Sequence, residues 1–176
     1  MNIRSKVNTG LEKEQFINIL KDHKRLLYKV IYLYCRDMDD RKDLEQEIIL
    51  QLWKSLKNYN QEFKLSTWIY KIALNVAISY YRRDVKRKEK NKPYDETIFQ
   101  IAAEEDYSHD IVNKRNFLYK FINRLGELNK AIIILYLDEK SYKEISEIIG
   151  LTETNVATKI NRIKTKLKEN ISSLNN

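Results

Sequence analysis

Apolar side chains recur at helical intervals along most of the chain. Near its end, Val156, Ile160, Ile163 and Leu167 follow one another at steps of four, three and four residues, which places them on one side of a helix. Comparable spacings predict further helices at residues 11–34, 40–56, 66–90, 117–125, 128–137 and 141–149. Residues 1–10 have no period and are expected to fray. Because no stretch alternates as a strand does, the sequence predicts an all-α protein.

The segment from Ser141 to Ile160 predicts two helices separated by a tight turn. Ser141 and Glu144 have the spacing of a capping box, Gly150 suits the left-handed end of a helix, and Thr152 is placed to cap the next helix. The polar side of the second helix carries hydroxyl, amide and basic groups, at Thr154, Thr158, Lys159, Asn161, Arg162, Lys164, Thr165 and Lys166. This pattern is typical of a helix-turn-helix whose second helix enters the DNA major groove. The alternative is an ordinary helical hairpin with a solvated basic face.

Charge divides the chain into parts. The whole sequence has a net charge of +8 at pH 7, which suits an anionic partner such as nucleic acid. Residues 54–92 carry eleven basic and three acidic side chains, whereas residues 93–112 carry six acidic side chains, no Lys or Arg, and the only proline, Pro93. We therefore expect an acidic linker at residues 93–112 between two small helical domains, residues 11–92 and residues 113–170.

Several classes of function find no support in the sequence. Cys35 is the only cysteine, so neither an intrachain disulfide nor a cysteine-based metal cluster can form, and a reducing compartment fits. His23 and His109 lie in separate regions without a cysteine or acidic cluster at ligand spacing. Three glycines do not build a phosphate-binding loop, and no segment has the ~20 apolar residues of a membrane span. We expect a cytoplasmic protein with no cofactor, no metal and no catalytic residues.

Two faces can be distinguished on the predicted helix at residues 40–56. Large aliphatic residues repeat every four positions from Leu44 to Leu56 and form a core stripe. The other side combines charged and polar groups with a leucine and a tryptophan, at Asp43, Gln46, Glu47, Leu50, Trp53 and Lys54. Large apolar side chains on an outward face suggest a docking surface for another protein. For Trp53, the alternative is that a third helix of the same domain covers it.

The predicted helix at residues 66–90 is apolar almost all round but keeps one polar stripe. The stripe has steps of four, four, three and four residues and consists of Lys71, Asn75, Ser79, Arg82 and Lys86. It leads into a basic run from Arg82 to Lys90, including Arg83, which suits contacts to phosphates. For Tyr70 and Tyr81, packing in the core is favoured over a contact to nucleic acid.

A polar loop precedes this helix and bears two aromatic side chains. It runs from Asn58 to Lys64 and contains Tyr59 and Phe63. Aromatic rings beside basic groups suit unstacked bases of single-stranded nucleic acid. The loop and the polar stripe together predict a second nucleic-acid contact, separate from the helix-turn-helix.

Three motifs, in this order, resemble those of bacterial sigma factors of the extracytoplasmic-function (ECF) group. Residues 43–53 are similar to that family's D-L-x-Q-E-x-F-L-x-x-W helix. Residues 63–75 are similar to its F-x-x-T-W-L-Y-R-I-A-x-N segment, and residues 141–160 resemble its C-terminal helix-turn-helix. The resemblance spans about residues 20–168.

The resemblance implies a non-enzymatic protein with two helical domains, sigma-2 and sigma-4, which bind RNA polymerase core and two promoter elements. The residues that would contact the clamp helices of the β′ subunit are Asp43, Gln46, Glu47, Leu50 and Trp53. The helix at residues 128–137 would offer a cleft to the β flap. The acidic linker would follow the RNA exit path, and an anti-sigma factor is a candidate partner.

The resemblance also assigns the DNA contacts. The loop of residues 59–64 would capture a flipped base of single-stranded −10 DNA. The −10 contacts as a whole would be Tyr59, Phe63, Lys64, Lys71, Asn75, Ser79, Arg82, Arg83 and Lys86. Double-stranded −35 DNA would be read by Thr154, Thr158, Lys159, Asn161, Arg162 and Lys166.

The chain departs from the family pattern at a few motif positions. Ile49 replaces the usual aromatic residue of the first motif. Ala157 and Lys159 stand where the family often has a basic residue and an arginine, so the −35 preference does not carry over.

The alternative function is a stand-alone helix-turn-helix repressor or activator, which would bind palindromic DNA as a dimer without polymerase. A DNA-processing enzyme ranks below both, because the sequence has no apparent cluster of metal-binding carboxylates.

Overall fold

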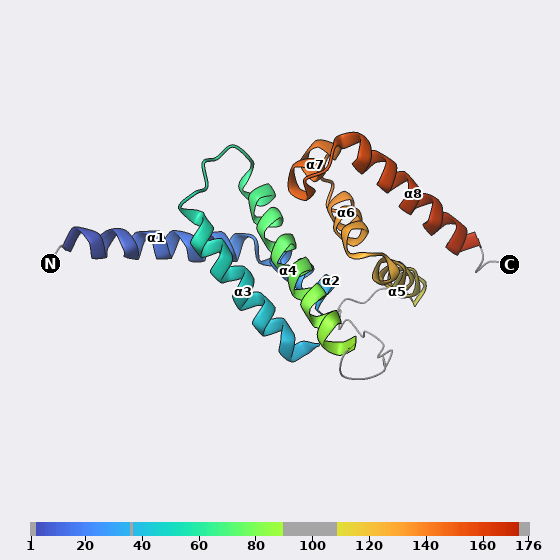
Figure 1. The fold of residues 1–176 in the computed structure, drawn as a ribbon, viewed down its shortest axis with the longest axis horizontal. Coiled ribbons are helices and arrows are strands. Elements are labelled where there is room, and N and C mark those ends of the chain that lie inside the picture. The colour runs from blue at the N-terminus through green and yellow to red at the C-terminus, as the bar shows by residue number, and fades with distance from the viewer. Residues whose placement is uncertain (1–2, 36, 90–108, 173–176) are drawn as a thin grey trace. The chain divides into compact units, whose positions relative to one another are not determined.

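The structure, a computed structural model, describes residues 3–35, 37–89 and 109–172, with side chains described at 12–35, 37–87 and 116–172. These residues form eight α-helices and contain no strand (Figure 1), so the all-α prediction is confirmed for them. The chain divides into two compact units, Met1–Asp84 and Val85–Asn176. Each unit is considered by itself below.

The N-terminal unit packs three helices around one core. α2 (Lys24–Tyr34), α3 (Met38–Leu56) and α4 (Leu65–Glu89) follow the long α1 (Ile3–Asp22). The side chains that α2, α3 and α4 bury are Leu27, Val30, Ile31, Tyr34, Leu44, Ile48, Leu52, Thr67, Ile69, Tyr70, Ala73, Leu74 and Ala77. Each large aliphatic side chain removed from water contributes about 1.5–3 kcal/mol. The four-residue repeat predicted from the sequence for α3 is therefore its core face.

The start of the chain differs from the sequence-based expectation. The backbone is helical from Ile3, so residues 3–10 belong to α1 and are not frayed. The single helical run predicted at residues 11–34 is broken at His23, whose backbone angles are φ −107° and ψ 15°. The Ile19 carbonyl oxygen faces both the backbone N–H and the Nδ1 atom of His23, at 3.1 Å and 2.9 Å. No glycine or proline marks this break in the sequence, so apolar spacing alone could not reveal it.

A side-chain cap fixes the start of α3. The carboxylate of Asp37 accepts hydrogen bonds from the backbone N–H groups of Asp39 and Asp40, at 2.8 Å and 3.3 Å. Such a cap satisfies donors that the first helical turn leaves without partners. The helix therefore begins at Met38, two residues before the predicted start at residue 40.

The C-terminal unit is built around α6 (Glu127–Leu137). Residues Ala131–Leu135 of this helix are all buried. They are covered because α6 contacts three other helices, α5 (His109–Arg124), α7 (Tyr142–Ile149) and α8 (Glu153–Ser172). α7 and α8 bury Ile145, Ile148, Val156, Ile160 and Ile163, which confirms the predicted stripe of α8 at three of its four positions, while Leu167 is only partly buried. Residues 109–112, predicted as linker, are helical. The rest of the predicted linker lies outside the described residues.

The helix-turn-helix forms with the predicted caps. The Glu144 N–H donates to Ser141 Oγ at 3.1 Å, and the Ser141 N–H donates to Glu144 Oε2 at 3.0 Å, which completes the capping box. Gly150 ends α7 with φ +76°, in the left-handed region. The Asn155 N–H donates to Thr152 Oγ1 at 3.3 Å at the start of α8. These local bonds set the angle at which α8 leaves α7.

Candidate nucleic-acid interface and docking face

The predicted docking residues occupy the side of α3 that the core does not cover. Asp43 and Gln46 are exposed, and Leu50 keeps 51% of its surface exposed. Glu47 and Trp53 are partly buried. A half-exposed leucine beside acidic and amide groups is the composition expected of a surface that binds another protein.

Trp53 also has a partner within its own unit. Its ring meets the ring of Phe16, from α1, edge-on, with centroids 5.0 Å apart and an interplanar angle of 62°. Phe16 is buried, with 6% of its surface exposed. A third helix therefore covers part of Trp53, as the alternative from the sequence had it, while the rest of the ring remains accessible.

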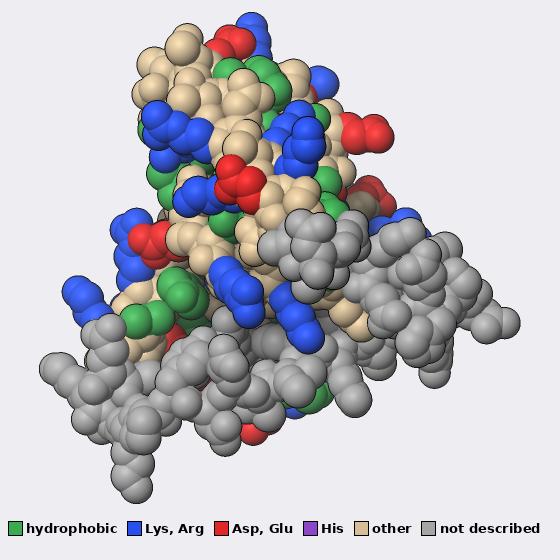
Figure 2. Space-filling view, turned by 90° about the vertical axis from the view of Figure 1, so that its right-hand side faces the viewer, with side chains coloured by type: hydrophobic (Ala, Val, Ile, Leu, Met, Phe, Trp, Pro, Cys, Tyr) green, Lys and Arg blue, Asp and Glu red, His purple; other side chains and the backbone are tan. Residues whose placement is uncertain are grey.

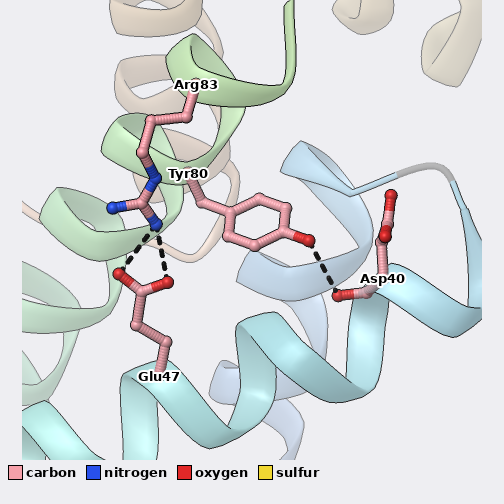
Figure 3. Close-up of polar contacts among 4 residues, drawn as sticks. All are labelled: Asp40, Glu47, Tyr80 and Arg83. Atoms are coloured by element: carbon pink, nitrogen blue, oxygen red, sulfur yellow. Dashed lines mark hydrogen bonds and ion pairs between the residues drawn. The ribbon is translucent and has the colours of Figure 1, made fainter. Parts of the chain in front are cut away.

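Glu47 and Arg83 form an ion pair across α3 and α4. Arg83 Nη2 donates to both carboxylate oxygens of Glu47, at 2.8 Å and 2.6 Å (Figure 3). The hydrogen bond that the Arg83 guanidinium donates to Glu47 raises the pKa of Arg83. The structure thus joins two residues that the sequence assigned to different partners, one to protein and one to DNA.

The polar stripe of α4 lies on its solvent side. Lys71, Asn75, Ser79, Arg82 and Lys86 are all exposed. On other sides of the helix, Tyr70 is buried and the Tyr81 ring packs edge-on against Tyr34, with centroids 6.2 Å apart. The two tyrosines therefore pack within the unit, as expected, and the residues of the stripe are exposed to solvent.

The aromatic loop before α4 is internally bonded. The Tyr59 ring packs against Trp68, with centroids 5.1 Å apart, and its hydroxyl donates to the Phe63 carbonyl oxygen at 2.8 Å. The Glu62 N–H donates to the Asn60 side chain at 3.2 Å, and Gln61 takes φ +61° at the turn. Tyr59 thus serves to hold the loop against α4.

Phe63 has a different environment from Tyr59. Its ring is partly buried and lies 5.6 Å from Lys71 Nζ, the first residue of the polar stripe. Lys64 beside it is exposed. Of the two loop aromatics, Phe63 is the one next to the basic groups that would attract a nucleic-acid strand.

The predicted reading face of α8 is exposed, opposite the buried stripe. Thr154, Thr158, Asn161, Arg162 and Lys166 are exposed, and Lys159 is partly buried. The Thr158 hydroxyl donates to the Thr154 carbonyl oxygen at 2.9 Å, and the Thr165 hydroxyl donates to that of Asn161 at 3.1 Å. These hydroxyl protons are engaged within the helix, whereas the amide of Asn161, the guanidinium of Arg162 and the ammonium of Lys166 are further donors on this exposed side.

Lys164 is oriented differently from the reading face. Its Nζ donates to the Tyr136 hydroxyl of α6 at 2.7 Å and lies 4.3 Å from the centre of that ring. This hydrogen bond raises the pKa of Lys164. The basic residue therefore links α8 to α6.

Comparison with protein families identifies both halves of the chain. Residues 19–87 match the model of sigma-70 region 2, and residues 118–167 match the model of sigma-70 region 4. Together the two matches cover well over half of the 176 residues.

The chain belongs to the sigma-70 family.

Similar proteins place it with the ECF type of sigma factor. It is 28% identical over 161 residues to RNA polymerase sigma factor YlaC of Bacillus subtilis, spanning 87% of this chain and 92% of that protein. It is 23% identical over 172 residues to ECF RNA polymerase sigma factor SigW of Bacillus subtilis, spanning 93% and 92%. In fold, it resembles the sigma factor RpoE from Bartonella quintana, solved with the anti-sigma factor NepR, with a TM-score of 0.71 and 19% identity over 91% of this chain and 96% of that one. The resemblance to ECF sigma factors stated from the motifs is thus confirmed.

The surface of this sigma factor carries charges of both signs. Figure 2 shows Lys and Arg side chains spread over the described part of one face, with Asp and Glu side chains between them. No uninterrupted basic field covers this face.

Sequence reasoning missed a groove between α1, α2 and α3 of this sigma factor. It has a volume of about 430 Å³ and is lined by Ile17, Leu20, Lys21, Lys24, Leu27, Tyr28, Ile31, Tyr32, Met38, Arg41, Lys42, Glu45 and Ile49. Two of the lining residues contact each other, because the Arg41 guanidinium carbon lies over the Tyr32 ring, 3.8 Å from its centre. None of the predicted contact residues lines this groove. The sequence does show basic residues among apolar ones in these segments. Only the packing of α1, α2 and α3 brings these residues together around one groove.

The described residues offer no site for metal chemistry. Within them, no three His, Cys, Asp or Glu side chains gather closely enough to hold a metal ion. No helix in the same part of the chain has the length and apolar character needed to cross a membrane. Sigma factors as a family are non-catalytic initiation factors.

Proposed function

We propose that this chain is an ECF sigma factor that directs RNA polymerase core to promoters bearing its own −10 and −35 elements. The observation that carries the proposal is the presence, in one chain and in order, of sigma-70 regions 2 and 4, each with an exposed polar helix face. The protein would have no enzymatic activity and no cofactor, and would act with polymerase in the cytoplasm.

Core polymerase would bind the outward side of α3. Asp43, Gln46, Glu47, Leu50 and Trp53 would meet the clamp helices of the β′ subunit. Leu50 would supply apolar contact area, because half of its surface is exposed in the free protein. The carboxylates would give orientation and a faster encounter with a basic partner surface.

The loop of residues 58–64 and the stripe of α4 would bind single-stranded −10 DNA. Lys71, Lys86 and Arg82 would neutralise phosphates, and Asn75 and Ser79 would face the strand. Phe63 would provide the ring against which a flipped base packs, while Tyr59 braces the loop. Extruding a base costs a few kcal/mol, which contacts made only with the open strand offset. Melting would thus follow from differential binding of the two DNA states, without a catalytic residue.

The outer side of α8 would lie in the major groove of the −35 element. The amide of Asn161 and the guanidinium of Arg162 are suited to adenine and guanine edges respectively. Lys166 and Lys159 would neutralise phosphates alongside. Thr154 and Thr158 would add contacts through their methyl groups and hydroxyl oxygens.

Two further contacts belong to the proposal. Most of α6 is buried, so a β flap contact would involve its exposed end at Leu137, which keeps 46% of its surface exposed. An anti-sigma factor is a candidate partner, because the structurally similar RpoE was solved in complex with the anti-sigma factor NepR.

The test is reconstitution with purified polymerase core. The tagged chain is mixed with core, isolated by gel filtration, and used in run-off transcription from a genomic promoter library. The proposal expects a one-to-one complex that initiates at promoters that core alone ignores. A chain that leaves core unbound yet shifts palindromic duplex DNA as a dimer would instead establish the repressor alternative.

A further inference from the structure

Arg83 lies at the margin of the polar stripe of α4, on the side next to α3. Successive residues of an α-helix are turned by about 100°, so Arg83 points well away from its neighbour Arg82. Figure 3 shows the direction it takes: its guanidinium reaches from α4 to Glu47 on α3. Arg83 follows Ser79 by four residues, about 40° round the helix, so it borders the stripe, and its side chain turns from there toward Glu47 on the docking face of α3.

The contact is well defined for a surface pair. One guanidinium nitrogen donates to both oxygens of Glu47, at 2.8 Å and 2.6 Å. The guanidinium carbon lies 5.7 Å from the centre of the Tyr80 ring, and the Tyr80 hydroxyl donates to the Asp40 backbone oxygen at 3.4 Å. Tyr80 thus joins α4 to the first turn of α3, and Arg83 joins it to the middle of that helix.

The Glu47 carboxylate can still accept a hydrogen bond from a partner protein while it is bonded to Arg83. A carboxylate offers about four acceptor positions, and Arg83 approaches with a single nitrogen. The Glu47 side chain is still 40% exposed. A basic group arriving from outside could therefore bond to the same carboxylate without displacing Arg83.

We propose that Arg83 is a positioning residue for polymerase binding, and not a contact to −10 DNA. It fixes the Glu47 carboxylate in one orientation on the docking face, so that less side-chain freedom is lost when polymerase binds. The inference rests on the proposed function, and it reassigns one residue from the DNA-binding set to the core-binding set.

The test measures core affinity and DNA binding in the same variants. Arg83→Ala should weaken core binding by about 2- to 12-fold, the effect of freeing one long side chain. In a Glu47→Ala background, the same change should have no further effect on core affinity, because Arg83 acts through Glu47. Arg83→Lys, which keeps a donor within reach of Glu47, should restore part of the affinity.

The salt dependence of promoter binding distinguishes the two roles. Removing one phosphate contact lowers the slope of log affinity against log salt by about 1. Arg82→Ala, the matched control on the stripe, should lower this slope and leave core affinity unchanged. Arg83→Ala should leave this salt slope unchanged when promoter binding is measured with the preformed holoenzyme.

Two results would overturn the inference. The first is that Arg83→Ala reduces the salt slope as much as Arg82→Ala does and leaves core affinity unaltered. The second is that Arg83→Ala weakens core binding equally in the presence and absence of Glu47. If the unaltered chain fails to bind core at all, the proposed function itself fails, which is a separate outcome. Melting temperatures near that of the unaltered chain would show that the variants are folded.

Discussion

The ring of Trp53 packs edge-on against Phe16, with centroids 5.0 Å apart, and this contact joins α1 to the docking face of α3. The two residues are far apart in the chain, and Phe16 is otherwise buried. Trp53 therefore has two roles, one in the stability of its unit and one in the proposed contact to polymerase. Its substitution must be interpreted with both in mind.

Phe16→Ala should destabilise the N-terminal unit by about 3 kcal/mol, because it removes a buried aromatic ring and leaves a cavity beside Trp53. Phe16→Leu is the control and should cost less than about 1.5 kcal/mol. Both tryptophans, Trp53 and Trp68, lie in this unit, so their fluorescence during urea unfolding reports its stability alone. If Phe16→Ala lowered the free energy of unfolding by less than about 1 kcal/mol, α1 would not pack against α3 in solution.

Leu50→Ala and Trp53→Ala should both weaken binding to polymerase core while leaving promoter choice unchanged. Only Trp53→Ala should also lower the melting temperature, because Leu50 is half exposed whereas Trp53 contacts Phe16. Core affinity is measured by fluorescence anisotropy, and promoter choice by sequencing of run-off transcripts. Altered promoter choice with normal core affinity would refute the assignment of this face.

Asn75→Ala and Arg162→Ala should each weaken promoter use by about 1–3 kcal/mol without changing core affinity. Both side chains are exposed on polar helix faces, so their truncation removes contacts to DNA and few contacts within the protein. The Arg162 change should also relax specificity at one position of the −35 element, which a library of promoter variants would detect. Uniform loss across all sequences would assign Arg162 to a phosphate instead.

Gly150→Ala should lower the stability of the C-terminal unit by about 1 kcal/mol, since an L side chain is strained at φ +76°. The space is open, with nothing within 4 Å of the added carbon, so the cost comes from the backbone angle alone. Gly126→Ala is the matched control, because its site is equally open and its φ is −62°. Because Gly126 is the N-cap of α6, where alanine is less favourable than glycine, the control should still cost about 0.5 kcal/mol, less than Gly150→Ala. Equal effects of the two changes would rule out the left-handed turn.

Cys35 should react slowly with iodoacetamide in the native protein. Only 4% of its surface is exposed, and burial, followed by the negative charge of Asp40, raises the pKa of its thiol to about 11. Since the thiolate is the reactive form, alkylation at pH 8 should be about 100-fold slower than in urea, and should accelerate about tenfold per pH unit up to pH 11. The raised pKa also means that this thiol stabilises the fold below about pH 9, and that the contribution is lost as the pH rises to about 11. Equal alkylation rates in native and unfolded protein would contradict the buried position.

The local features of the fold follow from the sequence by itself. The capping box of Ser141 and Glu144, the left-handed Gly150 and the apolar stripe of α8 depend on residues three or four positions apart, so their spacing predicts them directly. The same applies to the exposed stripe of α4, because a helix places residues at such steps on one side. Motif order was enough to indicate the family, which the match of regions 2 and 4 then confirmed.

Only the tertiary structure decided which side chains meet across helices. The contacts of Phe16 with Trp53 and of Glu47 with Arg83 join residues from different helices, the second pair 36 positions apart. Whether Tyr59 or Phe63 lies beside the basic stripe depended on how the loop folds onto Trp68. The spacing of apolar and polar residues along the sequence specifies the direction in which a side chain points from its own helix. It does not specify which helix lies opposite, since that depends on the packing of the whole unit.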